Sequence, residues 1–243
     1  MQDCNGVSTP MSSSESLMLN DSTPSHDATE YRKVIRKLQY LSFTMPDVSY
    51  SMNKLSQFMH APSEAHWRAV KRLIRYLKSI AHYGIRITQR SSLNLSVFYD
   101  VDWVGNLSDR SSTTGYIIFL GLSPVSWSSK QQRIIARSST EAEYRDVASA
   151  IDETIWVKNL LKELHVKILT PPTIFCDNLG VTYLYENNNL HSRMKHIAVH
   201  FHYIRQQVND KHLTFKHILS SYQLADSLTN RFQEPHFIAI CPS

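Results

Sequence analysis

The hydrophobic positions of this chain follow two different periods, and the change between them divides the sequence. In the first part apolar side chains recur at helical spacing, as in Trp67, Val70 and Ile74. The predicted helices cover residues 31–43, 48–58 and 63–79, and a short strand follows at 83–87. From residue 94 onward apolar and polar side chains alternate instead, which is typical of strands.

The second part begins with an alternating strand at Asn94–Asp102 that carries apolar residues on both faces. We therefore expect it to be central and covered on both sides. Strands at Gly115–Leu120 and Arg133–Arg137 complete a predicted antiparallel meander. The elements expected after it are a helix at 140–164, a strand at 173–176, helices at 179–185 and 195–208, a strand at 212–219 and a helix at 221–231. This order predicts a mixed α/β domain.

Composition narrows the class of protein. The 243 residues are 42% hydrophobic and carry a formal net charge of +5, which favours polyanionic partners. The cysteines Cys4, Cys176 and Cys241 are odd in number and far apart, so we expect a reducing compartment and no disulfide framework. We expect no membrane partner, because no apolar run reaches about 18 residues, and the first residues lack a signal-peptide pattern. Residues 1–29 are Ser-rich and predict an irregular linker.

A stripe of basic side chains lies beside the apolar stripe of the predicted helix 63–79. Its members are Arg68, Lys71, Arg72, Arg75 and Lys78. Such a stripe is most often a solvated helix face. The alternative is a surface that follows a phosphate backbone, since each contact releases counterions.

Four acidic residues fall at the ends or middles of predicted neighbouring elements: Asp100, Glu143, Asp177 and Asp226. Each has an ordinary alternative role, such as ending a strand, capping a helix or complementing a helix dipole. Together they predict a cluster whose mutual repulsion calls for a cation. Hard divalent ions with oxygen ligands suit such a cluster, and Mg²⁺ or Mn²⁺ is the expected cofactor. Asp102 shares a face with Asp100 and is the second choice for the first position.

Seven motifs occur in an order that is specific to one family. They are Tyr99-Asp-Val-Asp-Trp103, Asp109-Arg-Ser-Ser-Thr-Thr-Gly-Tyr116, Val125-Ser-Trp-Ser-Ser-Lys-Gln131, Arg137-Ser-Ser-Thr-Glu-Ala-Glu-Tyr144, Phe175-Cys-Asp-Asn178, His191-Ser-Arg-Met-Lys-His-Ile197 and Gln223-Leu-Ala-Asp226. Together they resemble the ribonuclease H domain of a plant Copia-type LTR retrotransposon Pol polyprotein. Residues 1–90 resemble the end of the preceding reverse transcriptase, its thumb or connection region. The resemblance covers essentially the whole chain.

This resemblance implies a ribonuclease H-like mixed sheet, with three antiparallel strands followed by alternating helices and strands, preceded by a small helical segment. The domains implied are an irregular linker at 1–29, a thumb- or connection-like remnant at 30–90, a ribonuclease H-like domain at 91–232 and a divergent tail at 233–243. The implied partners are an RNA–DNA hybrid and, where it is expressed in the same polyprotein, the remainder of the reverse transcriptase. The implied location is intracellular, in a cytoplasmic virus-like particle or the nucleus.

The implied activity is endonucleolytic hydrolysis of the RNA strand of the hybrid by a two-metal site. Asp100, Glu143, Asp177 and Asp226 would hold the metals. His217 resembles the mobile histidine that helps the product leave, and a plain strand histidine is its alternative. The polymerase aspartates are absent from the chain, so no DNA synthesis is expected.

Three alternatives stay open beside this interpretation. Two drifts from the family pattern, His200 in place of an acid and Asn230 in place of a lysine, are compatible with an inactive relic that still binds nucleic acid. The spacing of His196 and His200 allows a zinc site, although no HExxH motif is present. An integrase-like nuclease is the third, and the Asp-Glu-Asp-Asp order of the acids argues against it.

Overall fold

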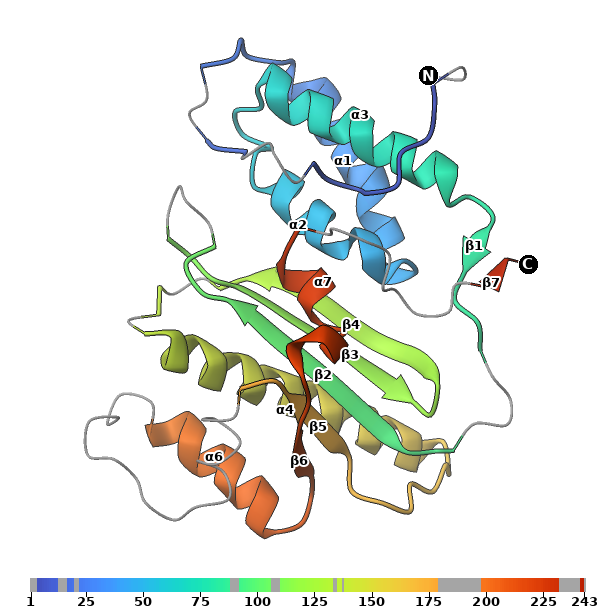
Figure 1. Cartoon of the computed structure of the whole chain (residues 1–243), viewed down its shortest axis with the longest axis vertical. Coiled ribbons are helices and arrows are strands. Elements are labelled where there is room, and N and C mark those ends of the chain that lie inside the picture. Colours follow the sequence, from blue (N-terminus) through green and yellow to red (C-terminus); the bar gives the residue numbers. More distant parts are fainter. Residues whose placement is uncertain are drawn as a thin grey trace.

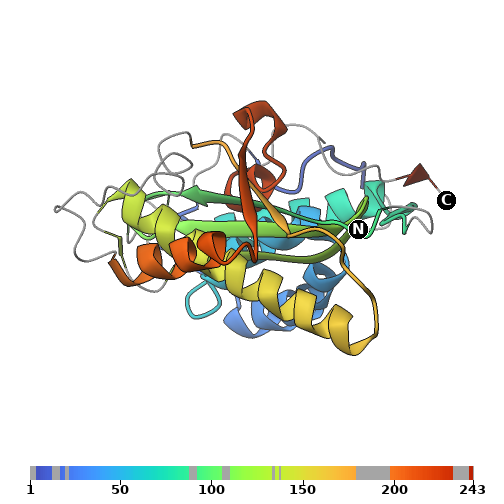
Figure 2. The same ribbon diagram turned by 90° about the horizontal axis from the view of Figure 1, so that it is seen from below.

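The structure is a computed structural model, and it describes residues 4–12, 17–19, 22–87, 92–105, 110–132, 135–136, 138–178, 198–231 and 241–242. A five-stranded mixed sheet forms the middle of the molecule, and a helical segment lies along its β4 edge (Figure 1). Helices α4 (Ser139–Glu163) and α6 (Ala198–Asn209) cover one face of the sheet, and the short helix α7 (Asp226–Thr229) covers the other (Figure 2). In the described part of the chain, no helix is long and apolar enough to span a membrane.

The helical segment matches the helices expected from the apolar periodicity. It consists of α1 (Ala28–Gln39), η1 (Tyr40–Phe43), η2 (Pro46–Val48), α2 (Ser49–Ser56) and α3 (Glu64–Ser79). Ser63 caps α3, because its side chain accepts a hydrogen bond from the backbone N–H of His66. The segment has its own core, in which Tyr31, Ile35 and Leu73 are fully buried.

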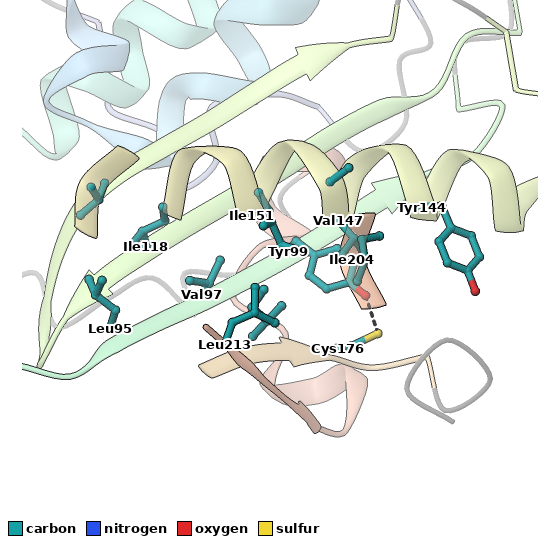
Figure 3. Packing of buried hydrophobic residues seen from close by; sticks show 14 of the residues in the cluster. Leu95, Val97, Tyr99, Ile118, Tyr144, Val147, Ile151, Cys176, Ile204 and Leu213 are labelled. Atoms are coloured by element: carbon teal, nitrogen blue, oxygen red, sulfur yellow. Dashed lines mark hydrogen bonds between the residues drawn. The ribbon is translucent and has the colours of Figure 1, made fainter. Parts of the chain in front are cut away.

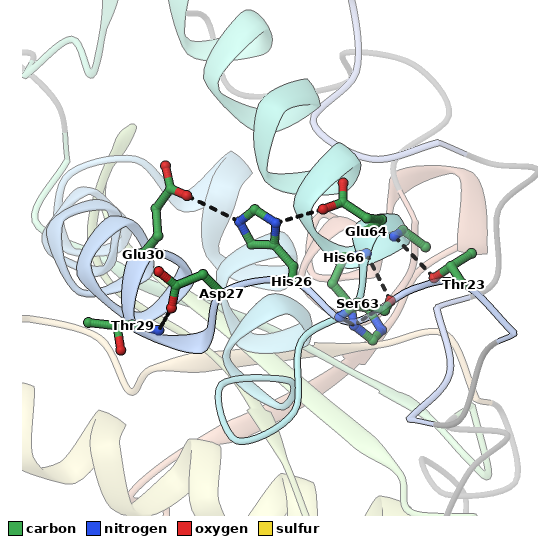
Figure 4. A network of polar contacts seen from close by, with 9 residues as sticks. Thr23, His26, Asp27, Thr29, Glu30, Ser63, Glu64 and His66 are labelled. Carbon is green, nitrogen blue, oxygen red and sulfur yellow. Dashed lines mark hydrogen bonds and ion pairs between the residues drawn. The ribbon is translucent and has the colours of Figure 1, made fainter.

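The N-terminal residues run along α3 and are fastened to it. The His26 ring stacks on Trp67 with the ring centroids 4.5 Å apart. Its Nδ1 lies 2.8 Å from a carboxylate oxygen of Glu64, and its Nε2 lies 3.4 Å from one of Glu30 (Figure 4). Nearer the N-terminus, the backbone carbonyl of Met18 accepts a hydrogen bond from His66 Nε2 at 3.0 Å. The described parts of residues 4–27 therefore pack on the helical segment.

The sheet has the strand order β4-β3-β2-β5-β6. The strands are β2 (Leu95–Asp102), β3 (Thr113–Leu120), β4 (Ser123–Gln131), β5 (Thr173–Cys176) and β6 (Thr214–His217). The first three are antiparallel neighbours, while β5 runs parallel to β2 and β6 parallel to β5. This confirms the predicted mixed sheet and places β2 at its centre.

The third strand of the meander was predicted ten residues too late, and this prediction is wrong. The observed β4 follows β3 after a two-residue turn in which Gly121 has φ 62°, a conformation that glycine adopts without strain. Pro124 at its start indicated a loop, but β4 is the edge of the sheet, where proline is tolerated. Pro124 has no backbone N–H to donate. It pairs with Phe119 next to a register shift, where the regular hydrogen bonding between the strands is interrupted.

The largest core lies between the sheet and α4 (Ser139–Glu163), with α6 (Ala198–Asn209) beside it (Figure 3). Alternate residues of β2, namely Leu95, Val97 and Tyr99, point into this core. The Tyr99 hydroxyl donates to Cys176 Sγ at 2.8 Å and so ties β2 to β5. The thiol is buried and belongs to the core.

The opposite face of β2 is also covered, as the sequence predicted. Phe98 packs with Ile117, Phe119 and Leu228, and Leu228 belongs to α7 (Asp226–Thr229). The sheet joins the helical segment where Trp127 Nε1 donates to the carbonyl of Ser42 at 2.7 Å.

The chain after β6 differs from the long helix predicted at 221–231. The structure has one turn, η4 (Ser220–Tyr222), and then the short α7. Gln223 is extended between them, and its side-chain oxygen accepts from the N–H of Ala225 at 3.3 Å. This side-chain hydrogen bond takes the place of a backbone hydrogen bond of a helix, so η4 and α7 do not join into one helix.

The remaining predictions lie mostly at the margins of the described chain. The strand expected at 83–87 is reduced to β1 (Tyr83–Gly84), which pairs with β7 (Cys241–Pro242). The helix predicted at 179–185 lies outside the described residues, as does His196 of the suggested zinc pair.

Candidate carboxylate site

Asp100 lies on the central strand β2 and is the most perturbed of the four predicted acids. Its pKa is raised to about 6: burial is the largest cause, a hydrogen bond from the Thr229 hydroxyl lowers the pKa, and the charges of Asp226 and Asp177 raise it. Thr229 reaches Asp100 because α7 lies directly on β3: a Cβ at Gly115 would come within 2.7 Å of the Leu228 Cβ. Glycine at that position therefore sets the distance between α7 and the carboxylate.

Glu143 is held in the first turn of α4. Ser138 caps the helix by accepting from the backbone N–H of Glu141 at 3.2 Å. The Asn178 side-chain amide donates to both carboxylate oxygens of Glu143, at 2.9 and 3.0 Å. Burial raises the pKa of Glu143, the hydrogen bonds from Asn178 lower it, and the charge of Asp177 raises it.

Asp177 follows β5 at the edge of the sheet that holds Asp100. The register pairs Phe175 with Phe98, which brings the residues two further along each strand to the same level. His217 ends β6, is exposed, and donates from Nε2 to the backbone carbonyl of Asp177 at 3.2 Å. The predicted histidine therefore lies at the border of the site.

Asp226 is the first residue of α7, although the sequence placed it one turn inside a longer helix. It is exposed, and its Oδ1 accepts from the Asn230 side chain at 2.6 Å. Its charge raises the pKa of both Asp100 and Asp102. The residue that replaces the family's lysine thus supports one of the acids directly.

Asp102 is half-buried and lies two residues after Asp100 on β2, on the same face of the strand. Burial is the largest cause of its raised pKa. The charge of Asp226 also raises the pKa, and the charge of Lys54 in α2 lowers it. A Cβ at Gly105 would collide with its carboxylate, so a larger residue at that position would require the Asp102 side chain to move. Asp100 interacts with Asp177 and Asp226, whereas Asp102 interacts with Asp226 and with the helical segment.

Two further acids of α4 were not assigned a buried role from the sequence. Glu141, in the first turn of α4, is 5% exposed and accepts from Arg145 Nη2 at 2.7 Å. Asp146 is 1% exposed, and neither of its oxygens has a hydrogen-bond partner among the described residues. Burial raises its pKa well above the usual range, and the charges of Asp100 and Glu143 raise it further. No local signal in the sequence separates Asp146 from a surface acid.

The chemistry of this donor set fits a hard divalent cation, because all of its charged groups are carboxylates. Burial is the main cause of the raised pKa of Asp100, and the charges of Asp226 and Asp177 add to it, so a cation beside Asp100 would offset an unfavourable charge. The orphaned oxygens of Asp146 add to the unsatisfied negative charge. Within the described ranges, however, no three His, Cys, Asp or Glu side chains converge on a single point that could hold a metal ion.

The predicted basic stripe belongs to α3, a helix that runs on the side of the helical segment away from the sheet (Figure 1). Part of it holds the N-terminal strap, residues 4–12. Arg75 Nε donates to the carbonyl of Asn5 at 2.8 Å, and Lys78 Nζ to that of Cys4 at 3.0 Å.

Arg72 Nη2 also binds the strap, by donating to the Thr9 hydroxyl at 2.7 Å. Arg68 and Lys71 are exposed beyond it, and Lys71 lies over the Trp67 ring at 5.7 Å. The acceptors in these three contacts are a hydroxyl and two carbonyls, which are uncharged and leave the charges of the arginines and the lysine in place.

Comparison with known proteins places the chain in a family. It is 49% identical over 223 residues to the retrovirus-related Pol polyprotein from transposon RE2 of Arabidopsis thaliana, covering 92% of this chain and 15% of that protein. The corresponding protein from transposon RE1 is 48% identical over 231 residues, covering 95% of this chain and 16% of that protein. The chain belongs to the retrovirus-related Pol polyproteins of transposons.

A third relative, the Pol polyprotein from transposon TNT 1-94 of Nicotiana tabacum, is 34% identical over 202 residues and covers 82% of this chain and 15% of that protein. The chain thus spans about a sixth of the length of these relatives. Over that segment the retrotransposon Pol chain carries the ribonuclease H-like sheet described above. No protein-family model matches it.

Solved structures with related folds overlap only partly. LC11-RNase H1, isolated from compost, has a TM-score of 0.43 at 17% identity and covers 57% of this chain and 94% of that chain. The foamy viral protease–reverse transcriptase in complex with an RNA/DNA hybrid has a TM-score of 0.41 at 13% identity, covering 88% of this chain and 27% of that chain. The fold assignment therefore rests on the strand order and directions of the sheet itself.

Proposed function

We propose that this Pol segment hydrolyses the RNA strand of RNA–DNA hybrids, with Mg²⁺ or Mn²⁺ held by Asp100, Glu143, Asp177 and Asp226. The observation that supports the proposal is the buried Asp100 on the central strand, whose pKa is raised to about 6 by burial and by the charges of Asp226 and Asp177, while the charge of Asp177 also raises the pKa of Glu143. A fold keeps such mutually repelling groups together at a cost, which a bound cation offsets. Bound divalent ions supply activation of a water and stabilisation of the leaving oxygen.

The residues of the site divide the remaining work. Asn178 orients both oxygens of Glu143, and Thr229 holds Asp100 on the side of α7. Asn230 holds Asp226 in the same way. His217, exposed beside the Asp177 carbonyl, can carry a proton at the border of the site, where a product phosphate leaves.

The proposed substrate has one deoxy strand and one strand with 2′-hydroxyls, which a protein reads mainly by helix shape and by contacts to those hydroxyls. The charge of +5 and the basic face of α3 favour a polyanionic duplex. We place Arg68, Lys71, Arg72, Arg75 and Lys78 along its backbone. The rest of the reverse transcriptase is the proposed protein partner of the helical segment.

A cleavage assay tests this function. A labelled RNA–DNA hybrid should be cut in Mg²⁺ or Mn²⁺, while single-stranded RNA and duplex RNA should stay intact. Chelation should stop the reaction, and added cation should restore it. Cleavage that survives exhaustive chelation would contradict the cation-dependent mechanism.

The second candidate is a relic that binds nucleic acid without cutting it. It is favoured by the finding that no three His, Cys, Asp or Glu side chains converge on a metal-binding point in the described part of the chain. Salt-dependent hybrid binding without cleavage at any cation concentration would select this candidate.

A further inference from the structure

A buried acid that has no role in the proposed mechanism lies beneath the site. Asp146 follows Glu143 by one turn of α4, and its side chain is 1% exposed. At this level α4 packs on β2 and β3. Both of its carboxyl oxygens lack a hydrogen-bond partner among the residues that the structure describes. Buried carboxyl groups are normally hydrogen-bonded or paired, so this one needs an explanation.

The surroundings of Asp146 offset its burial only weakly. The neighbouring Thr114 hydroxyl, which donates to the carbonyl of Lys130 at 3.1 Å, lowers the pKa of Asp146, but burial and the charge of Asp100 raise that pKa by more. The charges of Asp100 and Glu143 are close enough to raise the pKa of Asp146 beyond the effect of burial. Glu141, on the same helix and 5% exposed, is by contrast paired with Arg145 at 2.7 Å. The fold therefore pairs one buried acid of α4 with a cation and leaves the other among acids.

We propose that Asp146 is a fifth carboxylate of the cation site, placed under Asp100 and Glu143 and stabilised by the divalent ion that they bind. The inference rests on the proposed cation dependence of the site. An ion beside these two residues offsets the repulsion between them and Asp146. By linkage, an acid that the ion stabilises also strengthens the binding of that ion. The cation-free protein carries the full cost of burying Asp146, and the cation-bound protein carries less of it.

The test compares Asp146→Asn and Asp146→Ser with the wild-type chain. Glu163→Gln is the matched control, because it removes one acidic charge from the exposed end of the same helix. Thermal melts with and without Mg²⁺ report stability, and Mn²⁺ titration followed by electron paramagnetic resonance reports the dissociation constant. Both Asp146 variants should melt higher than the wild type without cation and gain less from Mg²⁺. Their Mn²⁺ dissociation constant should rise about tenfold, as for loss of a group that supports a metal site.

Other results overturn the inference. Equal stabilisation with and without Mg²⁺, at an unchanged Mn²⁺ dissociation constant, would make Asp146 only an unfavourable buried acid. Variants that fail to fold would also contradict it, since they would show that Asp146 stabilises the cation-free protein. If the wild type still cleaves the hybrid in these cases, the proposed function stands and only this inference falls. A wild type that neither binds Mn²⁺ nor cleaves the hybrid would contradict both this inference and the proposed function.

Discussion

The side-chain amide of Asn178 lies 2.9 and 3.0 Å from the two carboxylate oxygens of Glu143 and donates to both. The residues are 35 positions apart, one in the first turn of α4 and the other just after β5. The contact orients one acid of the site from the loop that carries another, Asp177. It therefore links the geometry of Glu143 to that of Asp177.

Replacing Asn178 by Ala should lower the rate of hybrid cleavage by about tenfold while leaving hybrid binding unchanged, because a supporting group is lost and not a ligand. The acidic limb of the pH–rate profile should move up, since these hydrogen bonds lower the pKa of Glu143. Asn159→Ala, on the exposed side of α4, is the matched control. An unchanged rate and pH profile would assign the amide to packing alone.

Asp177→Asn should abolish cleavage and leave the fold intact. The charge of Asp177 raises the pKa of Asp100 and Glu143, so its removal relieves repulsion and should slightly raise the melting temperature without cation. With Mg²⁺ the variant should gain less stability than the wild type. Thermal melts with and without Mg²⁺, paired with the hybrid assay, measure this. If Asp177 only caps the following turn, asparagine would cap about as well and activity would survive.

The stability of the cation-free protein should fall as the pH rises through about 6. Burial, aided by Asp226 and Asp177, raises the folded pKa of Asp100 to about 6, against roughly 3.9 in the unfolded chain. Between these values the folded state binds more protons than the unfolded state, so protonated Asp100 contributes stability that is complete at low pH. Up to roughly 3 kcal/mol is lost by neutral pH.

Melts of the wild type and of Asp100→Asn without cation, at about pH 5 and about pH 7.5, test this. The asparagine variant should gain stability relative to the wild type as the pH rises. A constant difference between the two proteins would show that Asp100 titrates at its ordinary pKa.

Two pairs of residues on the basic face of α3 should differ in their effect on the melting temperature when they are replaced. Arg68→Gln with Lys71→Gln should weaken hybrid binding and reduce its salt dependence by up to about one unit of slope per lost contact. The melting temperature should hold, because neither side chain fastens the N-terminal strap in the described residues. The comparison variant carries Arg75→Gln and Lys78→Gln. It should weaken hybrid binding and also lower the melting temperature, because both side chains hold the N-terminal strap. A salt slope that stays the same in both pairs would indicate a solvated face.

The sequence by itself determined the elements whose signals are local. The period of two in β2, the period near 3.6 in α3 and the capping serine before α3 depend on side chains within a few residues of one another. The acids at element ends could be named for the same reason, and their roles as metal ligands stay predictions. The family motifs, read in order, were enough to indicate the mixed sheet.

Only the tertiary structure decided the features that depend on distant partners. β4 is a strand because β3 offers it a pairing edge, although Pro124 indicated a loop. α7 is short because Gln223 bonds the backbone N–H of Ala225. Asn178 and Asp146 acquire their importance from Glu143 and Asp100, which α4 and β2 bring beside them. Burial and pairing are properties of the packed molecule, and a carboxylate reads the same in a sequence whether it meets water, an arginine or another acid.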